Sequence, residues 1–357
     1  MRTLTAALLT LGDPNRLTGG YLYHRRMAEE APRHGAKLDF LSFPDRLFPV
    51  AVLDAPAVLQ RVRMLSADAL VVDSIAAAFL GPWLAVSRPS LPMIGMLHQP
   101  PGGIDHGPVR TSVQAVLDRL TYRRARLLMV ASESLADQLS AEGVPGKMLK
   151  VVPPGRDLAA VSKAASADLR LGRGAAFLCV GNWVERKGIH CLLDAFASLP
   201  DGAATLHLVG DDMAGSRYAR RLRERLSRPD LAGRVVVHGP LSREAVAAMY
   251  QAADAFVLPS FKEPYGTVYG EAMAAGLPVV GWRAGNLPHL AENEREGLLV
   301  SPNDLEGLGA ALARLSADEA LRLRLGAAAL ERAQARPTWS ESAALFYEAV
   351  RGVVEAQ

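Results

Sequence analysis

The chain has little cysteine and no long apolar run. Among its 357 residues there are two cysteines, Cys179 in an apolar strand-like run and Cys191 in a helical one. Because they form no Cys-x-x-Cys pair, the sequence gives no case for a disulfide framework or a structural zinc site, and a reducing compartment fits. No run of about eighteen apolar residues occurs, so no transmembrane helix is expected.

Charge of one sign is equally scarce, because 40 Lys and Arg stand against 37 Asp and Glu, for a formal net charge of +3. Such a balance gives no general case for nucleic acid as a partner, and we expect none. The apolar opening of the chain, residues 1–11, is cut short by Gly12, Asp13 and Pro14. We interpret it as a first β-strand and not as a signal peptide, and we expect a cytoplasmic protein.

Apolar residues, in contrast, make up 50% of the chain, and its length allows two buried cores. Short runs rich in Val, Leu and Ile alternate with longer helical stretches, a pattern typical of parallel sheets covered by helices on both faces. The expected strands are 4–10, 37–42, 69–72, 93–97, 127–130 and 149–152, then 177–180, 205–209, 234–238, 255–258, 278–281 and 297–300. They predict an α/β fold of two doubly wound units.

The seam between the two units is predicted just after Val152. A Pro-Pro-Gly segment follows, and then an Ala-, Ser- and Lys-rich stretch with the composition of a linker. We therefore place the first domain at residues 1–160 and the second at 161–337. The last segment, 338–357, opens after Pro337 with a serine cap and then shows helical spacing of apolar residues.

The segment from Glu263 to Glu271 carries the most specific signal in the chain. Pro264 and Gly266 break regular structure, and the residues from Val268 onward predict a short helix. The amides around Gly266 to Val268 therefore lack intrahelical acceptors, and they carry the positive end of the helix dipole. Such a helix start suits a bound phosphate or diphosphate.

Two carboxylates flank that anion site. Glu263 lies just before it, and Glu271 lies more than one turn inside the helix. Because carboxylates accept hydrogen bonds, neither would help to bind phosphate, and we expect both to hold neutral hydroxyl groups on either side of it. A ligand with hydroxyl groups on both sides of a diphosphate is a nucleotide sugar. The alternative is a loop and a helix turn whose two glutamates are merely solvated.

This segment resembles the Glu-x7-Glu motif of the retaining family-four glycosyltransferases, which have the GT-B fold. The resemblance implies two Rossmann-like domains facing across a cleft, the first on the acceptor side and the second binding the donor, with the C-terminal helix crossing back to the first. It also implies that Glu263 contacts the donor sugar and Glu271 the nucleotide ribose. The remaining donor contacts that it implies in this segment come from Tyr265, Gly266, Thr267 and Val268.

Two segments of the first domain also match the family. Gly19 and Gly20, preceded by Thr18, are similar to the family's Gly-Gly loop near the donor phosphates, where glycine lets backbone amides approach an anion. His98 leads into a loop rich in Pro and Gly, and at this position the family has a histidine that contacts the donor sugar near the reacting carbon. The alternative for His98 is a capping or core histidine. The loop 99–107 would form part of the acceptor wall.

The second domain opens with a segment that resembles the family's Gly-Arg-x4-Lys-Gly phosphate site. Gly181, Lys187 and Gly188 match this pattern, so Lys187 would offset the charge that builds on the leaving diphosphate. Asn182 stands where the family has Arg, and Arg186 could supply the missing cation from the same loop. We expect Gly181 and Asn182 to contact the donor. The alternative is a solvated Arg-Lys pair at a helix start, which the helix dipole disfavours.

Two further segments contain polar residues that we do not assign to catalysis. The segment 284–290 resembles the family's Gly-Gly-x-Pro-Glu segment beside the donor, but Asn286 and His289 are substitutions in it, so we give His289 no catalytic role. Asp211 and Asp212 lack the alternate spacing of a metal-binding Asp-x-Asp, and we interpret them as an N-cap pair. We expect no essential metal and no cofactor.

The resemblance implies metal-independent transfer of a sugar, with retention of configuration, from a nucleotide-diphosphate sugar to an acceptor hydroxyl. The acceptor would be a glycan, a lipid-linked sugar or a small molecule, in cell-envelope or polysaccharide biosynthesis. Two alternatives stay open: a GT-B sugar-nucleotide epimerase or hydrolase, and a non-catalytic subunit that binds nucleotide sugar. The nucleotide base, the sugar and the acceptor are not indicated by the sequence.

A run of arginines in the first domain raises the question of a membrane contact. Arg119, Arg123, Arg124 and Arg126 lie beside Leu and Tyr residues in a segment expected to be a basic amphipathic helix. Such a helix could rest on an anionic membrane surface, on the inner face of the membrane. The more frequent alternative is an ordinary solvated helix face.

Overall fold

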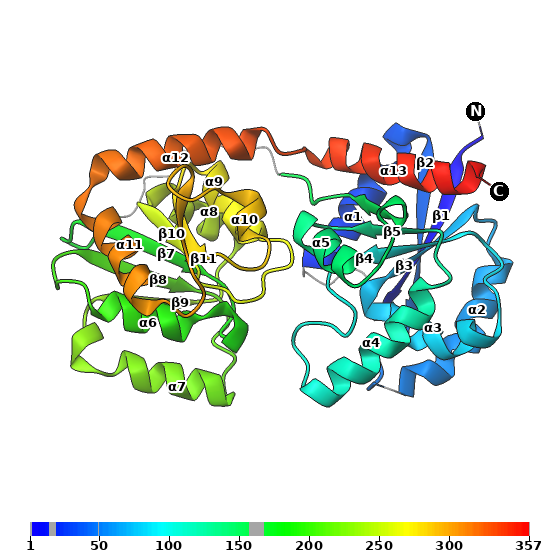
Figure 1. Ribbon diagram of the computed structural model, residues 1–357, viewed down its shortest axis with the longest axis horizontal. Helices are drawn as coiled ribbons and strands as arrows, with labels where there is room; N and C mark the ends of the chain where they lie inside the picture. The colour runs from blue at the N-terminus through cyan, green and yellow to red at the C-terminus, as the bar shows by residue number, and fades with distance from the viewer. Residues whose placement is uncertain (1, 14–18, 49, 157–167, 357) are drawn as a thin grey trace. The chain divides into compact units, whose positions relative to one another are not determined.

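The computed structural model describes residues 2–13, 19–48, 50–156 and 168–356. Its elements form two compact units (Figure 1). Unit 1 comprises Met1–Asp157 and Pro337–Gln357, and unit 2 comprises Leu158–Arg336. The expected linker falls almost wholly on residues 157–167, which lie outside the described residues, as does Thr18.

Each unit is built on a six-stranded parallel sheet, which confirms the predicted doubly wound α/β fold. The strand order is β2-β1-β3-β4-β5-β6 in unit 1 and β12-β11-β10-β7-β8-β9 in unit 2. The strands of unit 1 are β1 (Leu4–Leu11), β2 (Ala36–Phe43), β3 (Ala69–Asp73), β4 (Met93–Leu97), β5 (Leu127–Val130) and β6 (Leu149–Val151). Those of unit 2 are β7 (Ala175–Val180), β8 (Ala204–Val209), β9 (Val235–Gly239), β10 (Ala255–Val257), β11 (Val279–Trp282) and β12 (Gly297–Val300).

Helices connect these strands and cover both faces of each sheet (Figure 1). Unit 1 contains α1 (Gly19–Glu30), α2 (Ala55–Met64), α3 (Ser74–Val86), α4 (Pro108–Tyr122), α5 (Glu133–Ala141) and α13 (Trp339–Glu355). Unit 2 contains α6 (Ile189–Ala197), α7 (Arg217–Leu226), α8 (Arg243–Ala252), α9 (Thr267–Ala274), α10 (Leu287–Leu290), α11 (Leu305–Ala317) and α12 (Glu319–Gln334). Short 3-10 helices are η1 (Ala31–His34), η2 (Val50–Asp54), η3 (Gly146–Met148), η4 (Glu185–Lys187) and η5 (Pro229–Leu231).

The central strands are apolar because they are covered on both faces. Every residue of β3, β4 and β8 is buried, as expected where helices pack on both sides of a parallel sheet. Among the described residues, no helix is both long enough and apolar enough to cross a membrane.

The C-terminal helix α13 packs on unit 1, as the resemblance implied. The hydroxyl group of Tyr347 in α13 donates to the carbonyl oxygen of Met27 in α1 at 2.7 Å. The expected serine cap is wrong, because Thr338 caps α13 and forms a capping box with Glu341. A threonine one residue after Pro337 serves this role equally well, since its hydroxyl can accept the amide of the third helical residue.

Gly155 determines how closely the chain passes α13. A Cβ atom at this position would overlap the backbone of Trp339. We predict that Gly155→Ala destabilises unit 1 by about 1–3 kcal/mol, because the contact is with backbone atoms that cannot rotate away. The check is the free energy of unfolding in urea. Gly146→Ala, at a glycine with open space around its Cα, is the control, and an equal loss in both variants would contradict the prediction.

The loop after β4 is held by a buried carboxyl group. Asp118 in α4 is 2% exposed, and its Oδ2 accepts the amide of Gly102 at 2.8 Å. Burial raises the pKa of Asp118 to about 7, and the hydrogen bonds from Gly102 and Gln114 lower it only in part. The loop expected to form the acceptor wall is therefore anchored to a group that titrates near neutral pH.

This anchor predicts a pH dependence of stability. The pKa of Asp118 is raised from 3.8 to about 7 on folding, so the folded protein binds this proton more tightly. The free energy of unfolding should therefore fall as pH rises from about 4 to 7, by at most about 1.4 kcal/mol per unit from this group. Asp118→Asn should remove that slope in urea unfolding measured at pH 5 to 8. Asp105→Asn, which removes an exposed carboxyl group from the same loop, should leave the slope unchanged, and equal slopes in all three proteins would refute the assignment.

Candidate active site

The predicted phosphate loop of unit 2 packs directly on the loop that carries Glu263. After β7, the chain forms η4 and then Gly188, whose φ of 66° lies in the left-handed region. A Cβ atom at Gly188 would overlap the carbonyl oxygen of Pro259. The amide of Phe261 also donates to the carbonyl oxygen of Arg186 at 2.7 Å. Glycine is therefore required where the two loops cross.

This crossing brings Lys187, Arg186 and Glu263 together. Lys187 is 8% exposed, and its ammonium group donates to Oε2 of Glu263. The guanidinium group of Arg186 lies 3.8 Å from the same oxygen and donates to the carbonyl oxygen of Lys262 at 3.0 Å. Two cations thus converge on one carboxylate, which leaves the cluster with one positive charge in excess.

Gly181 and Asn182 lie beside this cluster but contribute differently. A Cβ atom at Gly181 would touch the side chain of Lys187, with the nearest atom at 3.5 Å, so the lysine extends across the glycine. Asn182 is exposed, and its Oδ1 accepts the amide of Asp211 at 3.1 Å. The residue that replaces the family's Arg therefore holds the neighbouring loop in place, and Arg186 is the second cation beside Lys187.

The predicted anion-binding helix start is present as α9. Its N-cap is Gly266, with φ of 72°, and no side chain caps the first turn. The amides of the first turn, from Thr267 and Val268 onward, point out of the helix end and suit an anion. The side chain of Asn286 donates to the carbonyl oxygen of Tyr265 at 2.8 Å and so holds the preceding loop.

Glu271 lies inside α9 and is held by a residue of a different helix. Its side chain is exposed, and its Oε2 accepts the hydroxyl of Tyr250, from α8, at 3.2 Å. Tyr250 is 4% exposed, and burial is the main cause that raises its pKa, so it acts as a donor at neutral pH. The carboxylate is therefore oriented but still available to a ligand.

In unit 1, the predicted glycines and histidine lie next to each other. Gly19 and Gly20, which resemble the family's Gly-Gly loop, are the first two residues of helix α1. The helix extends back over them because each can adopt the helical backbone. Gly20 faces the imidazole of His98, since an added Cβ atom would lie 3.5 Å from its Cδ2.

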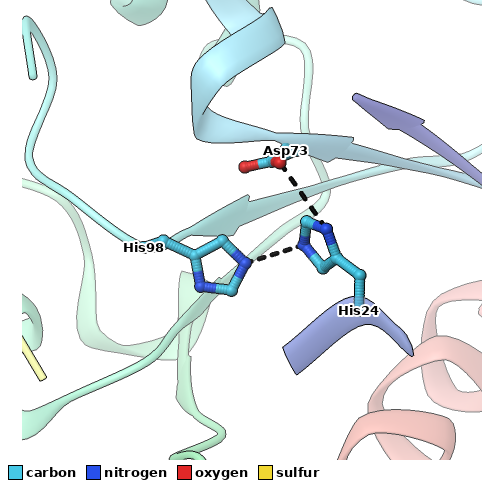
Figure 2. A group of neighbouring side chains, drawn as sticks. All are labelled: His24, Asp73 and His98. Carbon is cyan, nitrogen blue, oxygen red and sulfur yellow. Dashed lines mark hydrogen bonds and ion pairs between the residues drawn. The ribbon is translucent and has the colours of Figure 1, made fainter. Parts of the chain in front are cut away.

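His98 belongs to a buried polar network with His24 and Asp73. Nε2 of His98 lies 2.7 Å from Nε2 of His24, and Nδ1 of His24 lies 3.6 Å from Oδ2 of Asp73. Figure 2 shows the ring of His24 between the other two side chains. Potential ligand atoms of the three residues lie within 4.8 Å of one another, which is a separation that a metal site also requires.

The interpretation of Asp211 and Asp212 as an N-cap pair is wrong. They do not cap a helix, because α7 begins later and is capped by Ser216. Oδ1 of Asp211 instead accepts the amide of Met213 at 2.8 Å, and Asp212 pairs with Arg223. A serine nearer the helix is the better cap because its short side chain reaches the third helical amide.

The arginine run does not form one basic helix face. Helix α4 ends at Tyr122, so Arg123 is its C-cap, and Arg124 and Arg126 follow it. Arg119 pairs with Glu142 at 2.8 Å, and Arg124 donates to two carbonyl oxygens at the end of α3. Intramolecular partners therefore occupy two of the four guanidinium groups.

Several residues of the site had no assignment from the sequence. Asp73 ends a buried strand and precedes a helix, so the reasoning applied to His98 would also have found it. His24, Tyr250 and Asn286 lie within helices or turns and have no such local signal. Only their partners in the folded chain reveal them.

The chain is similar to known glycosyltransferases in both of its units. The family described as glycosyl transferase 4-like domain matches residues 3–155. The family described as glycosyl transferases group 1 matches residues 174–318. Together the two matches cover most of both units.

Relatives give the same result. A D-inositol 3-phosphate glycosyltransferase of Pseudarthrobacter chlorophenolicus is 32% identical over 246 residues, 66% of this chain and 58% of that protein. Another, of Xylanimonas cellulosilytica, is 30% identical over 283 residues, 74% of this chain and 67% of that protein. The chain thus spans between 58% and 67% of the length of these two relatives.

A solved structure shows the same fold. The structure of HepE of Anabaena in complex with UDP-glucose matches with a TM-score of 0.79 at 21% identity, over 97% of this chain and 99% of that one. At 21% identity this similarity shows only the fold. Membership of the family is shown by the sequence relatives and the family matches. The chain belongs to the family-four glycosyltransferases, with the GT-B fold.

Proposed function

We propose that the protein transfers a sugar from a nucleotide-diphosphate sugar to an acceptor hydroxyl, with retention of configuration. The observation that carries this proposal is the arrangement around α9. An uncapped helix start lies between a carboxylate held by two cations and a carboxylate held by Tyr250. Such a site offers amides and cations to a diphosphate, with acceptors for hydroxyl groups on both sides.

The cations supply the electrostatic part of the mechanism. Breaking the bond between the sugar and the phosphate leaves negative charge on the diphosphate. Lys187 and Arg186, with the first amides of α9, are positioned to stabilise that charge, which lowers the barrier only as the charge develops. The acceptor hydroxyl would attack on the face from which the phosphate leaves, and a phosphate oxygen would take its proton.

Glu263 keeps the two cations in place before the donor binds. A buried lysine without a partner would lose its charge or turn toward water. Because Glu263 accepts from Lys187 and lies 3.8 Å from Arg186, both cations stay near the anion site. A diphosphate would then share them with Glu263, whose other oxygen is left to bind a sugar hydroxyl.

The relatives favour this function over the two alternatives, an epimerase or hydrolase and a non-catalytic subunit. The relatives of Pseudarthrobacter and Xylanimonas are named glycosyltransferases, and HepE was solved with UDP-glucose. We extend the class of donor, a nucleotide-diphosphate sugar, from HepE to this chain. The absence of an essential metal, the cytoplasmic location and a peripheral contact of Arg119, Arg123, Arg124 and Arg126 with anionic membrane stay predictions.

Donor binding is predicted to depend on both ends of the site. Incubation with UDP-, GDP-, ADP- and TDP-sugars should raise the melting temperature with one nucleotide class, because a ligand present at about 100 times its Kd stabilises the fold by about 2.7 kcal/mol. Glu271→Gln and Lys187→Ala should each lose this shift. Glu306→Gln and Arg228→Ala, which change exposed residues of the same unit, should keep it. Absence of a shift with every donor would count against the proposal.

Tyr250 is predicted to position Glu271 for the ribose. Tyr250→Phe keeps the buried ring and removes the hydrogen bond to Oε2 of Glu271, so the Kd for the nucleoside diphosphate should rise about tenfold. In a Glu271→Ala background, which has no side-chain acceptor for the Tyr250 hydroxyl, the same change should have almost no further effect on the already weakened Kd, since both changes remove one contact. Tyr347→Phe, in unit 1, controls for a lost hydroxyl. Additive losses in the double variant would contradict this role.

A further inference from the structure

The side chains of Asp73, His24 and His98 form a network that is more deeply buried than contact between His98 and a ligand would require. His24 is 0% exposed, Asp73 1% and His98 6%. The residues come from α1, the end of β3 and the loop after β4, and β3 and β4 are neighbours in the sheet. Because these polar side chains are shielded from water and face one another, the charges and lone pairs of their neighbours restrict the positions of the protons in this network.

Asp73 determines which nitrogen of His24 carries a proton. Its Oδ2 accepts the hydroxyl of Thr10 at 2.9 Å, and its Oδ1 accepts from Ser74 and from the amide of Ile75. Nδ1 of His24 lies 3.6 Å from Oδ2. A lone pair on Nδ1 would face a carboxylate oxygen and be repelled, so this nitrogen carries the hydrogen.

The proton on His24 in turn determines the tautomer of His98. Burial lowers the pKa of both imidazoles, so at neutral pH each ring is neutral and carries one N–H. With Nδ1 of His24 protonated, its Nε2 is an acceptor. Nε2 of His98, 2.7 Å away, must then be the donor, which leaves the lone pair of His98 on Nδ1.

The ring of His98 is also held in orientation. Its backbone amide donates to the hydroxyl of Ser74 at 3.2 Å, and the ring of Tyr23 packs edge-on at a centroid distance of 5.1 Å. In Figure 2 one ring nitrogen of His98 points toward His24 and the other points away from the network. The tautomer therefore decides whether that second nitrogen donates or accepts.

We propose that Asp73 and His24 are positioning residues that fix the tautomer of His98, so that its Nδ1 is the nitrogen that can accept a hydrogen bond from a ligand hydroxyl group. The ligand of Nδ1 rests on the proposed function, whereas the tautomer does not. A metal ion is disfavoured at the same place. Both oxygens of Asp73 already accept hydrogen bonds, and the two Nε2 atoms are separated by a hydrogen-bond distance.

The test is the tautomer of each histidine, read from two-bond proton–nitrogen correlation spectra of the full chain labelled with 15N-histidine. The wild-type protein should show a protonated Nε2 on His98 and a protonated Nδ1 on His24. Asp73→Asn, whose amide can donate to Nδ1 of His24, should reverse both. Thr10→Val, which removes a donor to Asp73 and keeps the carboxylate, should change neither.

A second histidine pair provides an internal reference. In unit 2, Nδ1 of His207 lies 2.9 Å from Nε2 of His238, and Nε2 of His207 lies 2.8 Å from the carbonyl oxygen of Leu169. That carbonyl fixes the His207 tautomer without a carboxylate, so this pair should not respond to Asp73→Asn. If Asp73→Asn does not fold, His24→Leu should give a mixture of His98 tautomers.

Three results would overturn the proposal. They are a protonated Nδ1 on His98 in the wild-type protein, a single unchanged tautomer in His24→Leu, and saturable shifts of both rings with one equivalent of Zn²⁺, which would make the network a metal site. With a donor in hand, Asp73→Asn should lower kcat/KM about tenfold to a hundredfold. Failure of all donors to react would count against the proposed function, while the spectra would still decide the tautomer.

Discussion

Both units depend on one geometric constraint, which is that the strands of a parallel sheet all end at the same edge. In unit 1 this places Thr10, Asp73 and His98 together at the ends of β1, β3 and β4, which are neighbours in the sheet. In unit 2 it brings the loop after β7 against the loop after β10, which adjoin in the sheet. The sheet topology alone therefore brings polar residues from distant parts of the sequence close together.

The second common feature is that polar groups at these edges are held by one another. Lys187 is 8% exposed and pairs with Glu263, and His98 is 6% exposed and pairs with His24. Removing such groups from water is costly unless they find partners. The same pairing that makes burial tolerable fixes each side chain in a defined position, which is what a site for an anionic, hydroxyl-rich ligand requires.

The sequence predicted those features that follow from local pattern. The alternation of short apolar runs and helical stretches predicted twelve strands, and each of them overlaps a strand of the structure. The helix start at Gly266 was visible because proline and glycine disrupt the backbone in the segment before it. Local pattern was weaker at helix ends: α1 includes Gly19, and α13 is capped by Thr338. Several residues near a helix end can serve as its cap, and only packing selects one.

What the sequence determined by itself was therefore the α/β architecture, whereas its assignment of residues to a diphosphate and to hydroxyl groups stays a prediction. Tertiary structure decided the partners. Lys187 and Glu263 are 76 positions apart, and His24 and His98 are 74 apart, so no periodicity or motif relates them. Their contacts, the orientation of Glu271 by Tyr250 and the elevated pKa of Asp118 arise from burial and proximity, which exist only once the chain has folded.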